Sequence, residues 1–166
     1  MRQGSIRIAI LTVSDKGSRG ERIDTAGPAI KDCLKDLQIE VAAAEIVADD
    51  RAAIAAKLRH YCDELHCDLV FTTGGTGFSP RDVTPEATLD VIERSVPGIP
   101  EAIRAGGMGN TPKAMLSRAV AGIRGRTLVV NLSGSERAVR EQLAVILPVL
   151  AHAVETLRGQ GGDCGR

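Results

Sequence analysis

A strand that leads directly into a glycine-rich turn and then a helix constrains this chain more than any other feature. The apolar run at 68–71 predicts a buried strand. Three glycines follow within residues 74–77. Thr84 is then expected as a helix N-cap, with Pro85 at the first helical position. Strands that alternate with helices in this way are typical of α/β proteins with parallel sheets.

The same loop concentrates polar groups that a plain connection does not need. Hydroxyl side chains, Arg81 and Asp82 stand beside the glycines. Backbone N–H groups in a glycine-rich turn before a helix can surround an anion, and Asp82 offers a carboxylate to a metal ion. A tight strand-to-helix connection would explain the glycines but not this concentration of polar groups. We therefore predict an anion-binding site at this junction.

The alternation of strands and helices continues along the chain. Further strands are predicted at 6–13 and 39–47, and a hairpin at 116–123 and 126–132 with a turn at Arg124-Gly125. Helices are predicted at 25–37, 51–65, 86–94, 101–105 and 136–157. Ser135 should cap the last helix, and Pro148 should kink or divide it. The expected fold is a three-layer α/β/α arrangement whose mostly parallel sheet carries an antiparallel hairpin. We expect one domain over residues 1–158 and a disordered tail over 159–166.

Polar residues follow each predicted parallel strand. They are Ser14-Asp15, Asp49-Asp50, the glycine loop and Ser133-Gly134-Ser135. In open parallel sheets, ligands bind beyond the carboxyl ends of the strands where the strand order reverses. We therefore expect these loops to converge on one site. Either Asp49 or Asp50 should cap the following helix, which leaves the other to face a ligand or a divalent cation.

The composition restricts the classes of function. The formal net charge is zero and aromatic residues make up 2% of the chain, which argues against nucleic-acid binding and predicts an aliphatic core. The run at 6–13 is too short to span a membrane. The four cysteines lack zinc-site spacing; reduced thiols and the lack of a signal peptide indicate a cytoplasmic protein. Neither a P-loop nor a nucleophile elbow is present, and the three histidines fall in helical segments as expected packing or surface residues.

The central loop carries a resemblance to a known family. Its sequence, Thr73-Gly74-Gly75-Thr76-Gly77 followed by Arg81-Asp82-Val83-Thr84-Pro85-Glu86-Ala87-Thr88, is similar to the signature of the MoaB/Mog family of molybdenum cofactor biosynthesis. Matching segments follow in order at 12–15, 47–50, 116–118 and 131–132, so the resemblance extends from about Arg7 to Leu157. It implies the molybdopterin-binding fold and adenylylation of molybdopterin by MgATP, with release of pyrophosphate. It also implies a homotrimer and a downstream partner that inserts molybdate.

By matching positions, the resemblance implies that Asp49 and Asp82 are catalytic carboxylates that bind Mg²⁺. The residues expected to bind substrate and nucleotide are Ser14, Asp15, Thr73, Gly74, Gly75, Thr76, Gly77, Ser117, Gly134 and Ser135. Ser133 stands where many family members have proline. Two alternatives stay open: a non-catalytic molybdopterin carrier or scaffold that uses the same pocket, and a nucleotide-hydrolysing domain unrelated to pterin.

Overall fold

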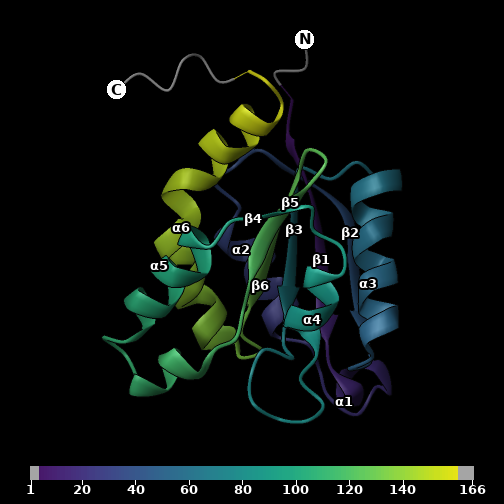
Figure 1. The fold of residues 1–166 in the computed structure, drawn as a ribbon, viewed down its shortest axis with the longest axis vertical. Coiled ribbons are helices and arrows are strands. Elements are labelled where there is room, and N and C mark those ends of the chain that lie inside the picture. Colours follow the sequence, from purple (N-terminus) through teal and green to yellow (C-terminus); the bar gives the residue numbers. More distant parts are fainter. Residues whose placement is uncertain (1–3, 161–166) are drawn as a thin grey trace.

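The computed structural model describes residues 4–160, which form a six-stranded sheet between two layers of helices (Figure 1). The strand order is β2-β1-β3-β6-β5-β4. Its strands are β1 (Ile6–Val13), β2 (Ile39–Val47), β3 (Leu69–Thr73), β4 (Arg94–Ser95), β5 (Ala121–Arg124) and β6 (Thr127–Leu132). The first four strands in that order are parallel, whereas β5 and β4 pair antiparallel. The predicted fold class and hairpin are thereby confirmed; most of the expected tail, residues 161–166, lies outside the described residues.

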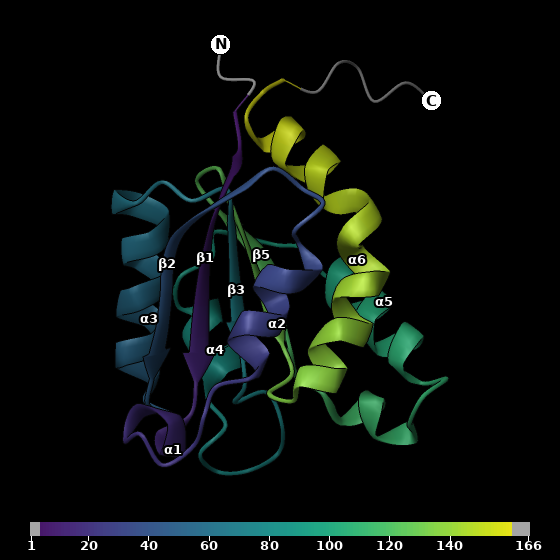
Figure 2. The same cartoon turned by 180° about the vertical axis from the view of Figure 1, so that it is seen from behind.

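Helices cover both faces of the sheet (Figures 1 and 2). They are α1 (Asp15–Ser18), α2 (Ala26–Cys33), α3 (Arg51–Arg59), α4 (Thr84–Leu89), α5 (Gly98–Gly107) and α6 (Glu136–Leu157), with a π-helical turn at His60–Glu64 and a 3-10 turn at Pro112–Leu116. Helices α2, α5 and α6 pack on one face, and α3 and α4 pack on the other. This coverage explains why the central strands are apolar along their whole length.

Alternation along β1 divides the core between the two faces. Ile8 and Ile10 pack with residues of α2 and α6, whereas Ala9 and Leu11 pack with residues of α3. All four side chains are at most 2% exposed, and the core around them is mainly aliphatic, as the composition predicts. Burial of this kind contributes about 25 cal/mol per Å² of apolar surface and fixes the sheet between its helices.

Four predicted boundaries were wrong because tertiary contacts outweigh local pattern. Helix α2 ends at Cys33, where a turn closed by the Leu37 N–H and the Leu34 carbonyl (2.9 Å) leads into β2. Helix α4 ends at Leu89, and the short strand β4 pairs with β5 where more helix was expected. Helix α5 begins at Gly98 and contains Pro100, which is tolerated because the first turn needs no intrahelical N–H bonds. Strand β5 begins at Ala121, later than expected.

The last helix, α6, begins at Glu136, as the sequence predicted. Ser135 is the N-cap of α6, and its side-chain oxygen accepts a hydrogen bond from the Ala138 N–H at 3.2 Å. Pro148 lies within this 22-residue helix and does not divide it.

The strand order reverses next to β1. The chain passes from β1 to β2 on one side, and then returns to β3 on the other side. The loops that follow β1, β2, β3 and β6 gather at the edge opposite the chain ends (Figures 1 and 2). Such a reversal is where α/β sheets bind ligands.

Candidate active site

Two adjoining pockets of about 500 Å³ each lie at this carboxyl edge of the sheet. Among the predicted site residues, the first pocket is lined by Ser14, Asp49, Thr73, Gly74, Gly75 and Asp82. The second pocket is lined by Thr76, Gly77 and Ser117. Gly134 and Ser135 line both pockets, so they mark the boundary between them. The structure therefore brings these residues together, although it divides them between two spaces, whereas the predicted residue Asp15 lines neither pocket.

The two neighbouring aspartates after β2 have different roles. A side-chain oxygen of Asp50 accepts a hydrogen bond from the Ala53 N–H at 2.7 Å and so caps α3. Asp49 lines the first pocket instead. Its Oδ2 accepts a hydrogen bond from the Asp15 N–H at 2.8 Å, and its own N–H donates to Asp15 Oδ1 at 3.0 Å. Within residues 4–160, Asp49 Oδ1 has no hydrogen-bond partner, so this oxygen remains available to a ligand.

The electrostatic environment of this pocket favours a cation. Burial raises the pKa of Asp49, and the negative charges of Asp15 and Asp82 raise it further. The hydrogen bonds from Arg81 to Asp15 hold the pKa of Asp15 below its usual value. A divalent cation between the carboxylates would offset their mutual repulsion. No group of three metal-binding side chains occurs among the described residues, so such an ion would need further ligands from its substrate.

Gly74 shapes the loop and does not offer its N–H to an anion. Its φ angle is +100°, and an added Cβ would lie 2.3 Å from the Val13 carbonyl oxygen. Its N–H donates to the Leu132 carbonyl at 3.1 Å. By contrast, the N–H groups of Gly75, Thr76 and Gly77 have no hydrogen-bond partner in the described part of the chain. These three groups therefore remain available as hydrogen-bond donors to a ligand.

Several predicted hydroxyl groups are engaged in holding the loops. The Thr73 hydroxyl donates to the Ser133 carbonyl at 2.6 Å, and Ser14 Oγ accepts from the Gly17 N–H at 3.0 Å. Ser133 occupies the position where the resemblance led us to expect proline. Its N–H donates to Gln142 Oε1 at 2.9 Å, and its hydroxyl oxygen accepts from Gln142 Nε2 at 2.7 Å. The serine thus fastens this turn to α6.

The expected role of Thr84 as N-cap was wrong. Thr84 is the first residue of α4, which Val83 precedes without a side-chain cap. The Thr84 hydroxyl donates instead to the Gly74 carbonyl at 2.9 Å. This bond crosses the base of the glycine loop, and the helix starts instead with the Ala87 N–H donating to the Val83 carbonyl at 3.0 Å.

Arg118 braces the loop, and sequence reasoning missed this role. Its Nε donates to the Gly77 carbonyl and its Nη2 to the Asp82 carbonyl, both at 2.8 Å. Its Nη1 pairs with Glu86, and its backbone N–H donates to the Thr76 carbonyl at 2.9 Å. The bonded residues are 41 and 36 positions away from Arg118, a separation at which local pattern carries no signal.

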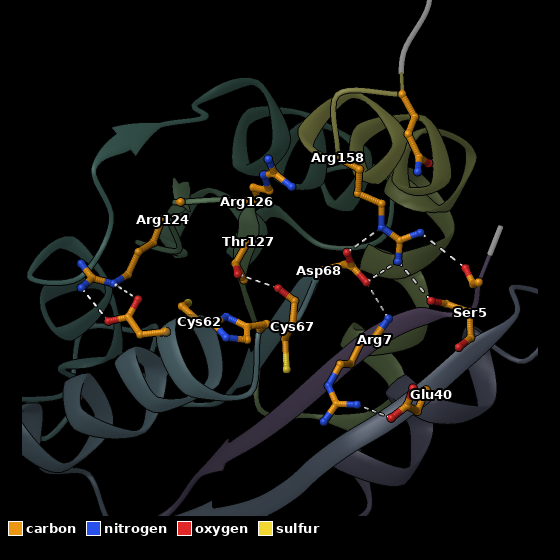
Figure 3. A pocket seen from close by; sticks show the side chains of 15 residues that line it. Ser5, Arg7, Glu40, Cys62, Cys67, Asp68, Arg124, Arg126, Thr127 and Arg158 are labelled. Atoms are coloured by element: carbon orange, nitrogen blue, oxygen red, sulfur yellow. Dashed lines mark hydrogen bonds and ion pairs between the residues drawn. The ribbon is translucent and has the colours of Figure 1, made fainter. Parts of the chain in front are cut away.

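A separate cavity of about 940 Å³ lies at the opposite, amino-terminal edge of the sheet (Figure 3). It contains none of the predicted site residues. Each of its three carboxylates is engaged by an arginine, in the pairs Arg7–Glu40, Arg124–Asp63 and Arg158–Asp68. We therefore assign these charges to holding the strand starts and the end of α6 together.

Cysteines and apolar helices offer no competing site. Cys33, Cys62 and Cys67 are free thiols, whereas Cys164 lies outside the described residues. None of the three histidines lines either of the two adjoining pockets. Among the helices of residues 4–160, none has the length and apolar character needed to cross a membrane.

The chain is similar in sequence and in fold to known proteins. Residues 9–152 match the sequence profile of a family described as "probable molybdopterin binding domain". The chain is 41% identical over 157 residues to a molybdopterin adenylyltransferase from Helicobacter pylori (strain J99), covering 93% of this chain and 89% of that protein. It is 38% identical to the molybdopterin adenylyltransferase of Escherichia coli (strain K12), covering 84% and 72%. The molybdopterin biosynthesis enzyme MoaB from Thermus thermophilus superimposes with a TM-score of 0.88 at 51% identity, covering 93% of this chain and 97% of that one.

Proposed function

The chain belongs to the molybdopterin-binding domain family, and from this premise we propose that it adenylylates molybdopterin with ATP in molybdenum cofactor biosynthesis. One observation carries the proposal. Asp49, Asp82 and Gly75, whose N–H is free among the described residues, line one pocket where the strand order reverses, and Thr76 and Gly77 line the adjoining pocket. This combination of carboxylates and anion-binding donors suits a reaction between two phosphate-bearing substrates.

The proposed step joins two anions. A terminal phosphate oxygen of molybdopterin attacks the α-phosphorus of ATP and forms a new P–O bond. The bond from that phosphorus to the bridging oxygen breaks, and pyrophosphate leaves with the electron pair. The attacking phosphate is already ionised, so no general base is required. The two adjoining pockets, which share Gly134 and Ser135, would offer one space to each substrate.

The residues of this chain would bind, orient and screen the reacting groups. The N–H groups of Gly75, Thr76 and Gly77 would donate to phosphate oxygens. Asp49 Oδ1 and Asp82 Oδ1, which lack hydrogen-bond partners among the described residues, suit an oxygen-binding cation. Mg²⁺ commonly binds one or two protein carboxylates together with substrate phosphates, and when bound it would neutralise charge on those phosphates.

The same proposal includes an oligomeric state, a partner protein and a cellular compartment. A homotrimer would cover exposed apolar side chains of α6 such as Val145 and Val149, which are 37% and 51% exposed. A separate molybdate-inserting protein would take the adenylylated product. Free thiols in the described residues support a reducing compartment such as the cytoplasm.

The test is a turnover assay with purified protein, molybdopterin, Mg²⁺ and ATP, which follows adenylylated pterin and pyrophosphate. We expect pterin-dependent formation of both products. Asp82→Asn should bind pterin nearly as well as the wild type but should lose turnover, because the amide cannot replace a charged metal ligand. Pterin binding without any product in the wild type would favour the carrier alternative. ATP consumption without pterin would favour a nucleotide-hydrolysing domain.

A further inference from the structure

The tip of the glycine loop is held by one exposed ion pair. Phe78, Ser79, Pro80 and Arg81 are all exposed to solvent. Arg81 donates from Nε and Nη2 to the two carboxylate oxygens of Asp15, at 3.0 and 2.9 Å. We infer that Arg81 is a phosphate-binding residue. Until the nucleotide binds, the Asp15 carboxylate occupies the Arg81 guanidinium in the position that phosphate later takes. This inference rests on the proposed adenylyl transfer and adds a residue to its nucleotide site.

The two partners of the ion pair differ in how firmly they are held. Asp15 exchanges reciprocal hydrogen bonds with Asp49, and its side chain is 26% exposed. The Arg81 side chain is 64% exposed, and within residues 4–160 its guanidinium has no hydrogen-bond acceptor other than Asp15. Arg81 is therefore the partner that can leave, while Asp15 stays fixed beside the pocket.

The position of Arg81 suits a polyphosphate. The residue directly precedes Asp82, which lines the first pocket, and it follows the free N–H groups of Gly75, Thr76 and Gly77 by a few positions. The negative charge of Asp49 is also among the causes that raise the pKa of Arg81, so the two side chains interact electrostatically. A guanidinium that binds a carboxylate through two parallel N–H groups can bind phosphate oxygens in the same way.

The charge balance favours the exchange of partners. Asp49 and Asp82 line the first pocket and Asp15 is bonded to Asp49, so the three carboxylates would repel a polyphosphate there. Arg81 supplies a positive charge at the same edge. Exposed ion pairs contribute little to stability, so opening the pair with Asp15 costs little against the gain from a phosphate contact.

The experiment measures binding of inorganic pyrophosphate, with Mg²⁺ in excess, by calorimetry. Arg81→Gln should weaken binding about tenfold, and Arg81→Lys should weaken it less because it keeps the charge but not the paired donors. Asp15→Asn should strengthen binding about threefold, because Arg81 no longer has to leave an anionic partner. In the Arg81→Gln background, the effect of Asp15→Asn should become smaller.

A matched control comes from a second exposed ion pair. Arg51 donates to both carboxylate oxygens of Asp90 at 2.7 and 2.8 Å, and its side chain is 55% exposed. Asp15 joins its pair to Asp49 of the first pocket, whereas Arg51 and Asp90 make no hydrogen bond to a residue that lines either pocket within the described chain. Arg51→Gln and Asp90→Asn should therefore leave pyrophosphate binding unchanged. These variants make the same changes of charge away from the site.

The outcomes separate this inference from the proposed function. One outcome is that the wild type binds pyrophosphate while Arg81→Gln binds it as strongly as the control Arg51→Gln. That result would overturn the role of Arg81 and leave the proposed adenylyl transfer standing. Weaker binding by Asp15→Asn would also overturn the inference, because the intact pair would then be what the phosphates require. Absence of pyrophosphate binding by the wild type would contradict the proposed adenylyl transfer and, with it, this inference.

Discussion

Removal of the Arg118 side chain should detach the glycine loop from its support. The guanidinium donates to the carbonyls of Gly77 and Asp82, both at 2.8 Å, and pairs with Glu86. In Arg118→Ala, these two carbonyls lose charged donors, and Asp82 loses the contact that fixes its backbone. The variant should therefore affect both stability and turnover.

The size of the effect follows from these contacts. A hydrogen bond from a charged group contributes roughly 1.5–3 kcal/mol. The Arg118 side chain is 34% exposed, so water can replace part of what is lost. We expect the free energy of unfolding to fall by about 2–3 kcal/mol. A shift of Asp82 by about 1 Å should lower turnover on the order of 100-fold in the folded variant.

The pKa of Glu86 makes the stability effect of removing Arg118 depend on pH. Burial raises the pKa of Glu86, but the hydrogen bond from Arg118 and other bonds outweigh it, so the pKa is lowered overall. A lowered pKa contributes stability above the ordinary pKa of a glutamate, and this contribution disappears as the pH falls through the folded-state value. Without Arg118, burial should raise the Glu86 pKa. The stability difference between variant and wild type should therefore shrink as the pH falls toward about 4.

Urea denaturation gives the stability, and the pterin-dependent assay gives turnover under conditions where the variant is folded. Arg137→Ala is the control, because Arg137 is 84% exposed and pairs only with Glu141 within the described residues. It should change the free energy of unfolding by less than about 0.5 kcal/mol. Turnover at the wild-type rate in a destabilised but folded Arg118→Ala protein would refute the bracing role, since loop position would then not depend on Arg118.

Two further predictions concern backbone shape and thiol reactivity. Gly74→Ala should lower the free energy of unfolding by about 3 kcal/mol or more, because φ is +100° and the new Cβ would lie 2.3 Å from the Val13 carbonyl oxygen. Gly125→Ala should cost only about 1 kcal/mol in the same denaturation assay, since φ is +56° and nothing lies within 4 Å; equal costs would contradict the steric argument. Burial raises the pKa of Cys62 and of Cys67 to about 11, so at about pH 8 only about 0.1% of each should be thiolate. Mass spectrometry should find both protected from iodoacetamide in the native protein and alkylated after denaturation, and rapid native alkylation would show that these thiols are not buried as described.

The sequence predicted those helices and strands whose signals lie within the element or directly beside it. The apolar runs of β1 and β2 gave the observed strand limits, and Ser135 marked the start of α6. The convergence of loops was also predictable, because a parallel sheet puts all its carboxyl ends at one edge. Local pattern could not assign Asp49 to the pocket and Asp50 to the cap, since either residue could cap the helix, whereas the family resemblance pointed to Asp49.

Features that depend on distant partners could not be read from the sequence. Strand β4 exists because Arg94 and Ser95 pair with β5, although the predicted helix extended as far as Arg94. The bracing role of Arg118 needs the carbonyl of Gly77, 41 positions away. The role of the Thr84 hydroxyl depends on the Gly74 carbonyl, ten positions earlier in the chain. In each case, the decisive contact is formed only when the chain is folded.

The glycine loop combines a buried, fixed base with an exposed tip. At the base, the side-chain amide of Asn131 is 1% exposed and donates to the hydroxyl oxygens of Thr72 and Thr88, both at 2.9 Å. An unpaired polar group there would be costly, so the base has one stable arrangement. The tip carries Arg81, whose exposed ion pair with Asp15 opens at little cost. Substitutions at the base should therefore change stability and activity together, whereas substitutions at the tip should change ligand binding, and the turnover that depends on it, with little change in stability.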